Sequence, residues 1–127
     1  MTNEYGPGNL NAPWDIVARP PYYYVANLSG AATYQILQFT LDAGNNFVLA
    51  GHYGTTGTTS PPGIFFGPRR FLAVRSDALI IVDSDTGTDE RLVSFADING
   101  AGWATYGSFG NTSTGIGHFK FWSLSAC

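Results

Sequence analysis

The feature that most constrains this chain is an internal repeat. The sequence GNNFVLAGHYG at positions 44–54 returns as GAGWATYGSFG at positions 100–110, fifty-six positions later. Repeated units each form one supersecondary element that buries its apolar surface against a neighbouring copy. The fold is therefore to be understood as two similar units. The alignment pairs Phe47 with Trp103, Gly51 with Gly107, Tyr53 with Phe109 and Gly54 with Gly110.

A second pattern marks where each unit begins. Glycine, any residue, a large apolar residue, two further residues and proline occur at 8–13 and again at 63–68. An altered copy at 117–122 has Trp122 in place of proline. The chain thus holds two complete units and the start of a third.

The length of 127 residues fits one domain of ordinary size. We expect a single domain over 1–127, made of units at about 8–62 and 63–116, with terminal tails that resemble overlapping pieces of unit junctions. Only 12% of the residues are charged, about half the usual fraction, and 44% are hydrophobic. This balance predicts that surface is hidden in an assembly.

Each unit is predicted to contain four β-strands. The segments are rich in β-branched and aromatic residues and are separated by turn-forming residues. No window sustains the three- and four-residue apolar spacing of a helix. The segments 55–62 and 111–116 are expected to be loops. The expected strands are the first at 14–18 and 69–74, the second at 22–27 and 79–84, the third at 35–39 and 91–95, and the fourth at 47–53 and 103–109.

The short motifs of the second unit resemble the NHL repeat. They are Gly-x-Phe-x-x-Pro from Gly63, Ile-Val-Asp ending at Asp83, Arg-Leu-Val-x-Phe from Arg91, and Gly-Ala-Gly-Trp ending at Trp103. The resemblance implies that each unit is a four-stranded antiparallel blade of a β-propeller, stacked on its neighbours around a central channel. The first unit departs from the pattern with Gln35 in place of Arg91. The period also exceeds the roughly 40–50 residues usual for propeller blades.

The resemblance further implies assembly between chains. A propeller needs four to eight blades, whereas this chain supplies two. An isolated pair would leave apolar faces exposed, and closed cyclic symmetry is the ordinary solution. We expect self-association into a trimer with six blades, with a four-bladed dimer as the alternative. A monomeric two-sheet β-sandwich is the alternative without assembly.

Charge and targeting signals exclude several function classes. The net charge is −3 with six basic residues, which provides no footprint for nucleic acid or an anionic membrane. The sequence shows neither a signal peptide nor a membrane span, so we expect soluble, cytoplasmic synthesis, with the final location open and a place in a larger particle compatible. The one cysteine, Cys127, cannot form a disulfide within the chain.

The sequence gives little sign of catalysis. His52 and His118 are the only histidines, too few for a three-histidine zinc site, and no nucleophile-elbow pattern is present. The acidic segment 83–90 offers Asp83, Asp85 and Asp89 as candidate calcium ligands, although turn chemistry alone explains the same residues. We expect no catalytic residue, no cofactor and no enzymatic activity.

Aromatic and basic residues supply the candidate ligand-binding sites. Aromatic faces stack on sugar rings, and Trp14, Tyr22 and Tyr24 are the best candidates for such contacts. Arg69 and Arg70 form a small basic group at the start of a first strand. We expect a self-assembling structural or protein-binding module, such as a decoration or cement component of a particle. The alternative is a multivalent carbohydrate-binding lectin.

Overall fold

A computed structural model describes residues 13–27, 34–56, 62–65, 67–84 and 90–106 of the chain. All regular secondary structure in these residues is β-strand, and none is helical. It follows that these segments contain no helix of the length and hydrophobicity that a bilayer crossing requires. The all-β class expected from the sequence is confirmed for this part of the chain.

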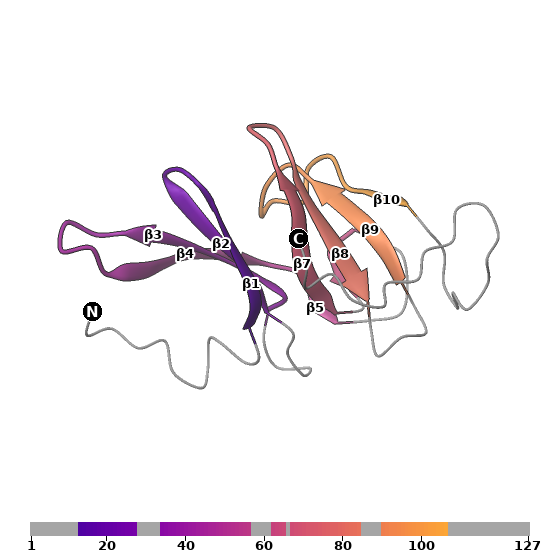
Figure 1. The fold of residues 1–127 in the computed structure, drawn as a ribbon, viewed down its shortest axis with the longest axis horizontal. Coiled ribbons are helices and arrows are strands. Elements are labelled where there is room, and N and C mark those ends of the chain that lie inside the picture. Colours follow the sequence, from indigo (N-terminus) through magenta and orange to yellow (C-terminus); the bar gives the residue numbers. More distant parts are fainter. Residues whose placement is uncertain (1–12, 28–33, 57–61, 66, 85–89, 107–127) are drawn as a thin grey trace.

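The strands form two four-stranded antiparallel sheets (Figure 1). In both sheets the strands are neighbours in the order in which they follow along the chain, as expected for two successive four-stranded units. The first sheet contains β1 (Pro13–Arg19), β2 (Tyr22–Asn27), β3 (Ile36–Leu41) and β4 (Phe47–Tyr53). The second sheet contains β7 (Pro68–Val74), β8 (Leu79–Ser84), β9 (Glu90–Phe95) and β10 (Ala104–Tyr106).

A short parallel pair follows the first sheet. β5 (Thr55–Thr56) pairs with β6 (Ile64–Phe65), and the Thr55 N–H donates to the Gly63 carbonyl oxygen at 2.8 Å. The segment predicted as a loop from 55 to 62 therefore begins with two strand residues. This pairing ties the start of the second unit to the end of the first.

The registers of the two sheets repeat with the period of the sequence. Tyr23 pairs with Phe39 across β2 and β3, and Leu79 pairs with Phe95 across β8 and β9. Each residue of the second pair lies fifty-six positions after its equivalent in the first. The β1–β2 and β7–β8 registers agree in the same way next to their turns. The sequence repeat is thus a structural repeat over the second and third strands and over the ends of the first strands next to the turn. Farther from the turn the two first strands differ in register, because β7 has an irregularity between Phe71 and Ala73.

The fourth strand departs from the predicted alignment. Tyr53 pairs with Ile36, and Tyr106 pairs with Leu92, which is the repeat equivalent of Ile36. Tyr106 therefore takes the place of Tyr53, whereas the sequence alignment assigns that place to Phe109, which lies outside the described residues. The alignment is wrong here because it matches glycines, while cross-strand pairing and the preceding turn fix the register of a strand.

The first strands of the two sheets lie side by side. A carboxylate oxygen of Asp15 accepts a hydrogen bond from the Phe71 backbone N–H at 2.9 Å, and Arg19 Nη1 donates to the Arg75 carbonyl oxygen at 3.4 Å. The partners in both contacts are 56 residues apart. Equivalent positions of β1 and β7 are therefore level with one another, so the two strands run in the same direction.

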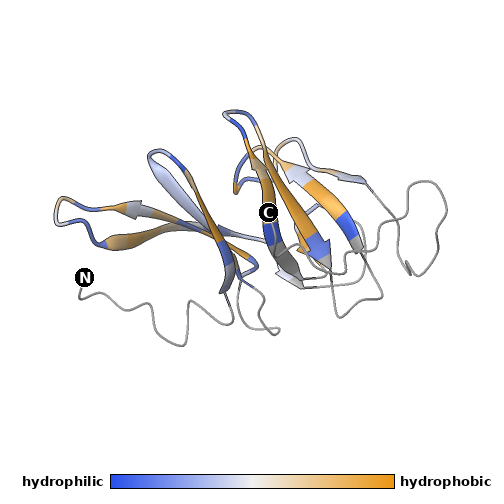
Figure 2. Cartoon of the chain, viewed as in Figure 1, coloured by the Kyte–Doolittle hydropathy of each residue, from blue (hydrophilic) through white to orange (hydrophobic). Residues whose placement is uncertain are grey.

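The two sheets bury one face of each against the other. Side chains alternate between the faces of a strand, so Tyr24 and Ala26 point toward the second sheet while Val25 points away. We call the faces that meet the inner faces and the opposite ones the outer faces. Hydrophobic residues lie along the strands of both sheets, and hydrophilic residues mark the hairpin turns (Figure 2). The buried core between the sheets consists of Tyr24, Ala26, Ile36, Phe65, Leu79, Ile81, Val93 and Phe95.

Candidate functional site

The three aromatic residues proposed for sugar binding differ in their exposure. Trp14 lies at the irregularity where β1 begins, and its side chain is 53% exposed. Tyr22 is half-buried, and its ring meets that of Tyr24 edge-on at 6.3 Å between centroids. Tyr24 is 0% exposed, so a sugar ring has no surface of Tyr24 on which to stack. Of the three, Trp14 offers the most accessible aromatic surface.

The two candidate basic residues are placed at the start of β7. Arg70 pairs with Val82 of β8, on the outer face of the second sheet, and its side chain is partly buried. The Arg69 backbone belongs to the same strand. The Arg69 side chain is outside the described part of the structure.

The candidate metal ligand Asp83 is a buried structural residue. One of its carboxylate oxygens accepts a hydrogen bond from Arg91 Nε at 2.8 Å, and the other accepts one from the Gly67 N–H at 2.9 Å. Asp85 and Asp89 lie outside the described residues. Within the described segments, no group of three or more histidine, cysteine, aspartate or glutamate side chains is placed to hold a metal ion.

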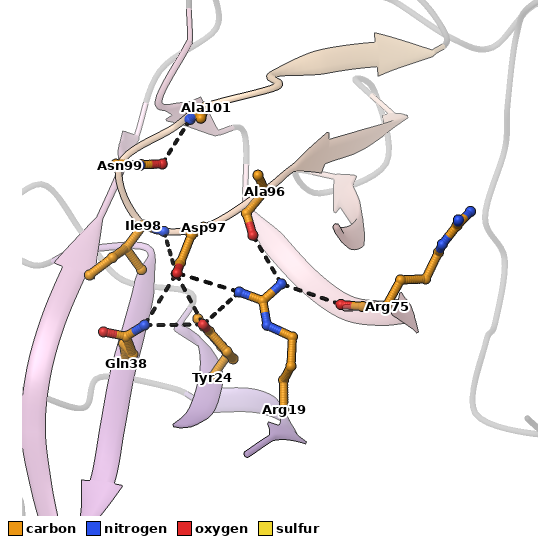
Figure 3. A network of polar contacts seen from close by, with 9 residues as sticks. All are labelled: Arg19, Tyr24, Gln38, Arg75, Ala96, Asp97, Ile98, Asn99 and Ala101. Atoms are coloured by element: carbon orange, nitrogen blue, oxygen red, sulfur yellow. Dashed lines mark hydrogen bonds and ion pairs between the residues drawn. The ribbon is translucent and has the colours of Figure 1, made fainter. Parts of the chain in front are cut away.

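A polar network joins the two sheets next to the core (Figure 3). Its centre is Asp97, in the turn between β9 and β10 of the second sheet. One carboxylate oxygen of Asp97 accepts hydrogen bonds from the Tyr24 hydroxyl at 3.0 Å, from Gln38 Nε2 at 3.1 Å and from the Ile98 N–H at 2.8 Å. Tyr24 and Gln38 belong to the first sheet, so the network fixes the position of one sheet on the other.

Arg19 completes the network from the end of β1. Its guanidinium donates to the Tyr24 hydroxyl at 2.7 Å and to the Ala96 carbonyl oxygen at 2.9 Å. It also lies 3.6 Å from the Asp97 carboxylate and 4.9 Å from the centroid of the Tyr24 ring. A planar guanidinium satisfies several acceptors at once, which suits Arg19 to this position.

Burial raises the pKa of the Tyr24 hydroxyl above its usual value of 10.0, because removal from water disfavours the charged phenolate. Hydrogen bonds from Gln38 and Arg19 oppose this shift, and the Asp97 carboxylate adds to it. Burial also raises the pKa of Tyr53. Both groups are therefore neutral in the folded chain up to strongly alkaline pH.

This pKa shift predicts a loss of stability at alkaline pH. Above about pH 10 the unfolded chain releases the Tyr24 proton more readily than the folded chain does, so the free energy of unfolding falls as pH rises. Tyr24→Phe should make this fall less steep by up to about 1.4 kcal/mol per pH unit. Urea unfolding between pH 8 and 11 measures the slope, with the exposed Tyr34→Phe as control. Equal slopes for wild type and Tyr24→Phe would contradict the assignment.

The residues of the polar network differ from the residues at the equivalent positions of the other sheet. By the register, Tyr24 and Gln38 of the first sheet correspond to Ile80 and Ser94 on the outer face of the second sheet. Phe95 corresponds to Phe39, so Asp97, two residues farther along, corresponds to Leu41 on the outer face of the first sheet. The polar contact between the inner faces thus has an apolar counterpart, Leu41 and Ile80, on the outer faces.

Three of the exposed large apolar side chains in the described residues lie on the outer faces, namely Ile16, Leu41 and Tyr106. Tyr106 is 62% exposed on the outer face of the second sheet, beside the half-buried Leu92. Ile16 and Leu41 are exposed on the outer face of the first sheet, at the margins of a cluster built on Val25, Leu37 and Phe39. Exposed apolar surface of this kind marks interaction sites. These two faces are the candidate functional site.

The sequence pointed to an assembly surface but not to these residues. The roles of Leu41, Ile80 and Tyr106 follow from pairing partners and from comparison of the two repeats, position by position. That comparison is possible from sequence for the second and third strands, where the two units stay in step. No protein-family model, curated protein or solved structure matches the chain.

Proposed function

We propose that the chain is a non-enzymatic, self-assembling module whose two sheets are successive blades of an NHL-like β-propeller that further copies complete. One observation supports this most strongly. The outer face of the second sheet is the repeat equivalent of the inner face of the first sheet, and the reverse also holds. The contact inside one chain can therefore be repeated between two chains.

The changes at equivalent positions favour such a contact. Consider a second copy whose first sheet packs on the outer face of the second sheet of this chain. Leu41 of the second copy then lies next to Ile80 of this chain, as Asp97 lies next to Tyr24 inside the chain. The two polar residues have been replaced together by two apolar ones. At these two positions the faces stay complementary, because an apolar residue meets an apolar one where a polar residue meets a polar one inside the chain.

The direction of this contact determines the symmetry of the assembly. Each copy uses the outer face of its second sheet on one side and that of its first sheet on the other, so the interface is head-to-tail. Head-to-tail contacts close into rings when the rotation allows it. We propose three copies and six blades, and two copies would give four blades, which also lies within the range of propellers.

The role of the ring is structural or protein-binding. The chain carries few charges, and the polar network around Asp97 joins its own two sheets. We propose a decoration or cement component of a larger particle, because such a component needs stable, uncharged contact surface more than chemistry. The proposed role depends on the surface of the ring and requires no cofactor.

Carbohydrate binding is the second candidate function, and the exposed indole of Trp14 favours it. A ring would repeat this indole once per chain, which would raise the avidity for a multivalent glycan. Loss of glycan binding in Trp14→Ala, with an unchanged solution mass, would support this alternative.

A matched pair of substitutions tests the proposed assembly. Leu41 and Val48 lie in the same β3–β4 hairpin and are 38% and 40% exposed, but they project to opposite faces of the first sheet. Leu41→Arg places an unpaired charge in the proposed interface and should raise the dissociation constant at least about tenfold. Val48→Arg should leave it unchanged. Light scattering after size exclusion measures both, and equal masses for the two variants would contradict the proposal.

A further inference from the structure

The side chain of Tyr53 shows how a tyrosine at this position is used inside the chain. Tyr53 projects from β4 on the inner face of the first sheet, and its ring lies 5.5 Å from Phe95, 6.0 Å from Phe65 and 6.2 Å from Trp103, between centroids. All three neighbours come from the second unit. Tyr53 is therefore the aromatic anchor of the contact between the two sheets.

Tyr106 is the same residue at the equivalent position of the second sheet. It pairs with Leu92 as Tyr53 pairs with Ile36, and it projects from the outer face. Unlike Tyr53, it has 62% of its surface exposed. A large aromatic residue that is exposed at a position used as an anchor elsewhere in the molecule indicates a second contact of the same kind.

We infer that Tyr106 anchors a second copy of this chain, and that its ring docks on the outer face of that copy's first sheet, over the cluster around Phe39. Phe39 itself is 3% exposed and packs against Phe47, so the ring would meet the half-buried Phe47 and the exposed Leu41 at the margin of this cluster. Phe39 is the repeat equivalent of Phe95, which receives Tyr53. This inference rests on the proposed function and adds to it the residue that carries the contact and the direction in which copies join. Tyrosine is enriched among such anchors because it buries a large rigid surface with two side-chain torsions.

Charge at the turns agrees with this docking direction. Arg19 at the end of β1 reaches the β9–β10 turn, where it meets the Ala96 carbonyl and Asp97. Its equivalent is Arg75, whose side chain is exposed beside Asp77 at 3.3 Å. In the docked pair, Arg75 would face the β3–β4 turn of the second copy, which carries Asp42. An exposed arginine thus meets a turn of opposite charge, as it does inside the chain.

The test uses two variants that each lose a different face. Tyr106→Arg removes the anchor on the second sheet but leaves the first-sheet face intact, whereas Leu41→Arg does the reverse. Each variant alone should be monomeric where the wild type assembles, with a dissociation constant raised at least about thirtyfold for Tyr106→Arg. An equimolar mixture should form pairs of two chains and no larger species, because each pair has used its only intact faces. Light scattering and native mass spectrometry measure the species formed.

The controls separate this inference from the proposed function. Tyr106→Phe keeps the ring and should assemble as the wild type does, and circular dichroism should show that the exposed Tyr106→Arg variant is folded. If Tyr106→Arg assembles normally, Tyr106 is not the anchor, although assembly itself stands. If both single variants are monomeric and the mixture stays monomeric, the head-to-tail pairing of these two faces is wrong. If the wild type is monomeric, the proposed function and this inference both fail.

Discussion

Arg91→Gln is expected to lower the free energy of unfolding by about 3–5 kcal/mol, because it leaves the buried Asp83 carboxylate without its cationic partner. The pair is almost inaccessible to solvent, with side-chain exposures of 2% and 0%. Arg91 also donates to the Ile64 carbonyl oxygen and lies 5.8 Å from the centroid of the Trp103 ring. Loss of the guanidinium therefore affects the second unit at both its beginning and its end.

The first unit supplies the matched control for this prediction. At the equivalent positions it has Asn27 and Gln35, both buried and neutral. Asp83→Asn alone should also be costly, because it leaves the Arg91 charge buried without its carboxylate. The double variant Asp83→Asn, Arg91→Gln copies the arrangement of the first unit, and it should recover at least about 2 kcal/mol relative to the sum of the single effects. Urea unfolding at one fixed protein concentration gives the four free energies.

Strict additivity of the two changes would show that Asp83 and Arg91 act independently, and the account of a linked pair would then be wrong. The measurement is sensitive because the expected coupling exceeds the usual error of extrapolation for a small domain.

Gly54→Ala is the second substitution with a large expected effect, at about 2–5 kcal/mol of lost stability. Gly54 has φ of 86°, a conformation that costs other residues about 1–2 kcal/mol. An added Cβ would also lie 2.3 Å from Cε2 of Phe65, whose ring is fully buried against Tyr53 and Trp103. Overpacking of a rigid core position adds roughly 1–3 kcal/mol.

Gly102→Ala separates the two contributions to this cost. Gly102 has φ of 69°, but an added Cβ would meet no atom closer than 3.8 Å. Gly102→Ala should therefore lower the free energy of unfolding only by the cost of the backbone conformation, about 1–2 kcal/mol. If thermal or urea unfolding shows equal losses for the two variants, contact with the Phe65 ring contributes nothing and the packing argument fails.

The strands that the sequence predicted best are those with clear boundaries. β2 and β8 agree with the predicted 22–27 and 79–84 because runs of aromatic and β-branched residues end there at turn-forming residues. The fourth strand was aligned wrongly because the glycine pattern repeats while the turn before β10 does not, and because β4 contains a bulge at Ala50 that is absent from the described pairing of β9 and β10. Turn length changes the register without leaving a sign in the strand itself.

The site was predictable only in part, for the same physical reasons. Tyr24 is the last of three consecutive tyrosines, and alternation places it in the core on the inner face, together with Tyr22, while Tyr23 between them lies on the outer face. Asp97 and Arg19 are joined by tertiary packing, and nothing local to either residue indicates the contact. The exchange of Asp83 and Arg91 for Asn27 and Gln35 is different, because a joint change in two copies of a repeat indicates a contact from sequence alone.

The central claim is that the outer faces bury one another in an assembly of identical chains, and the solution mass of the wild-type chain tests it most directly. Light scattering coupled to size exclusion, over a wide range of concentrations, gives that mass without a standard of similar shape. The proposed ring predicts a mass of three chains of 13.6 kDa each, and two chains would still support closure with four blades. A mass of one chain at every concentration would contradict the claim.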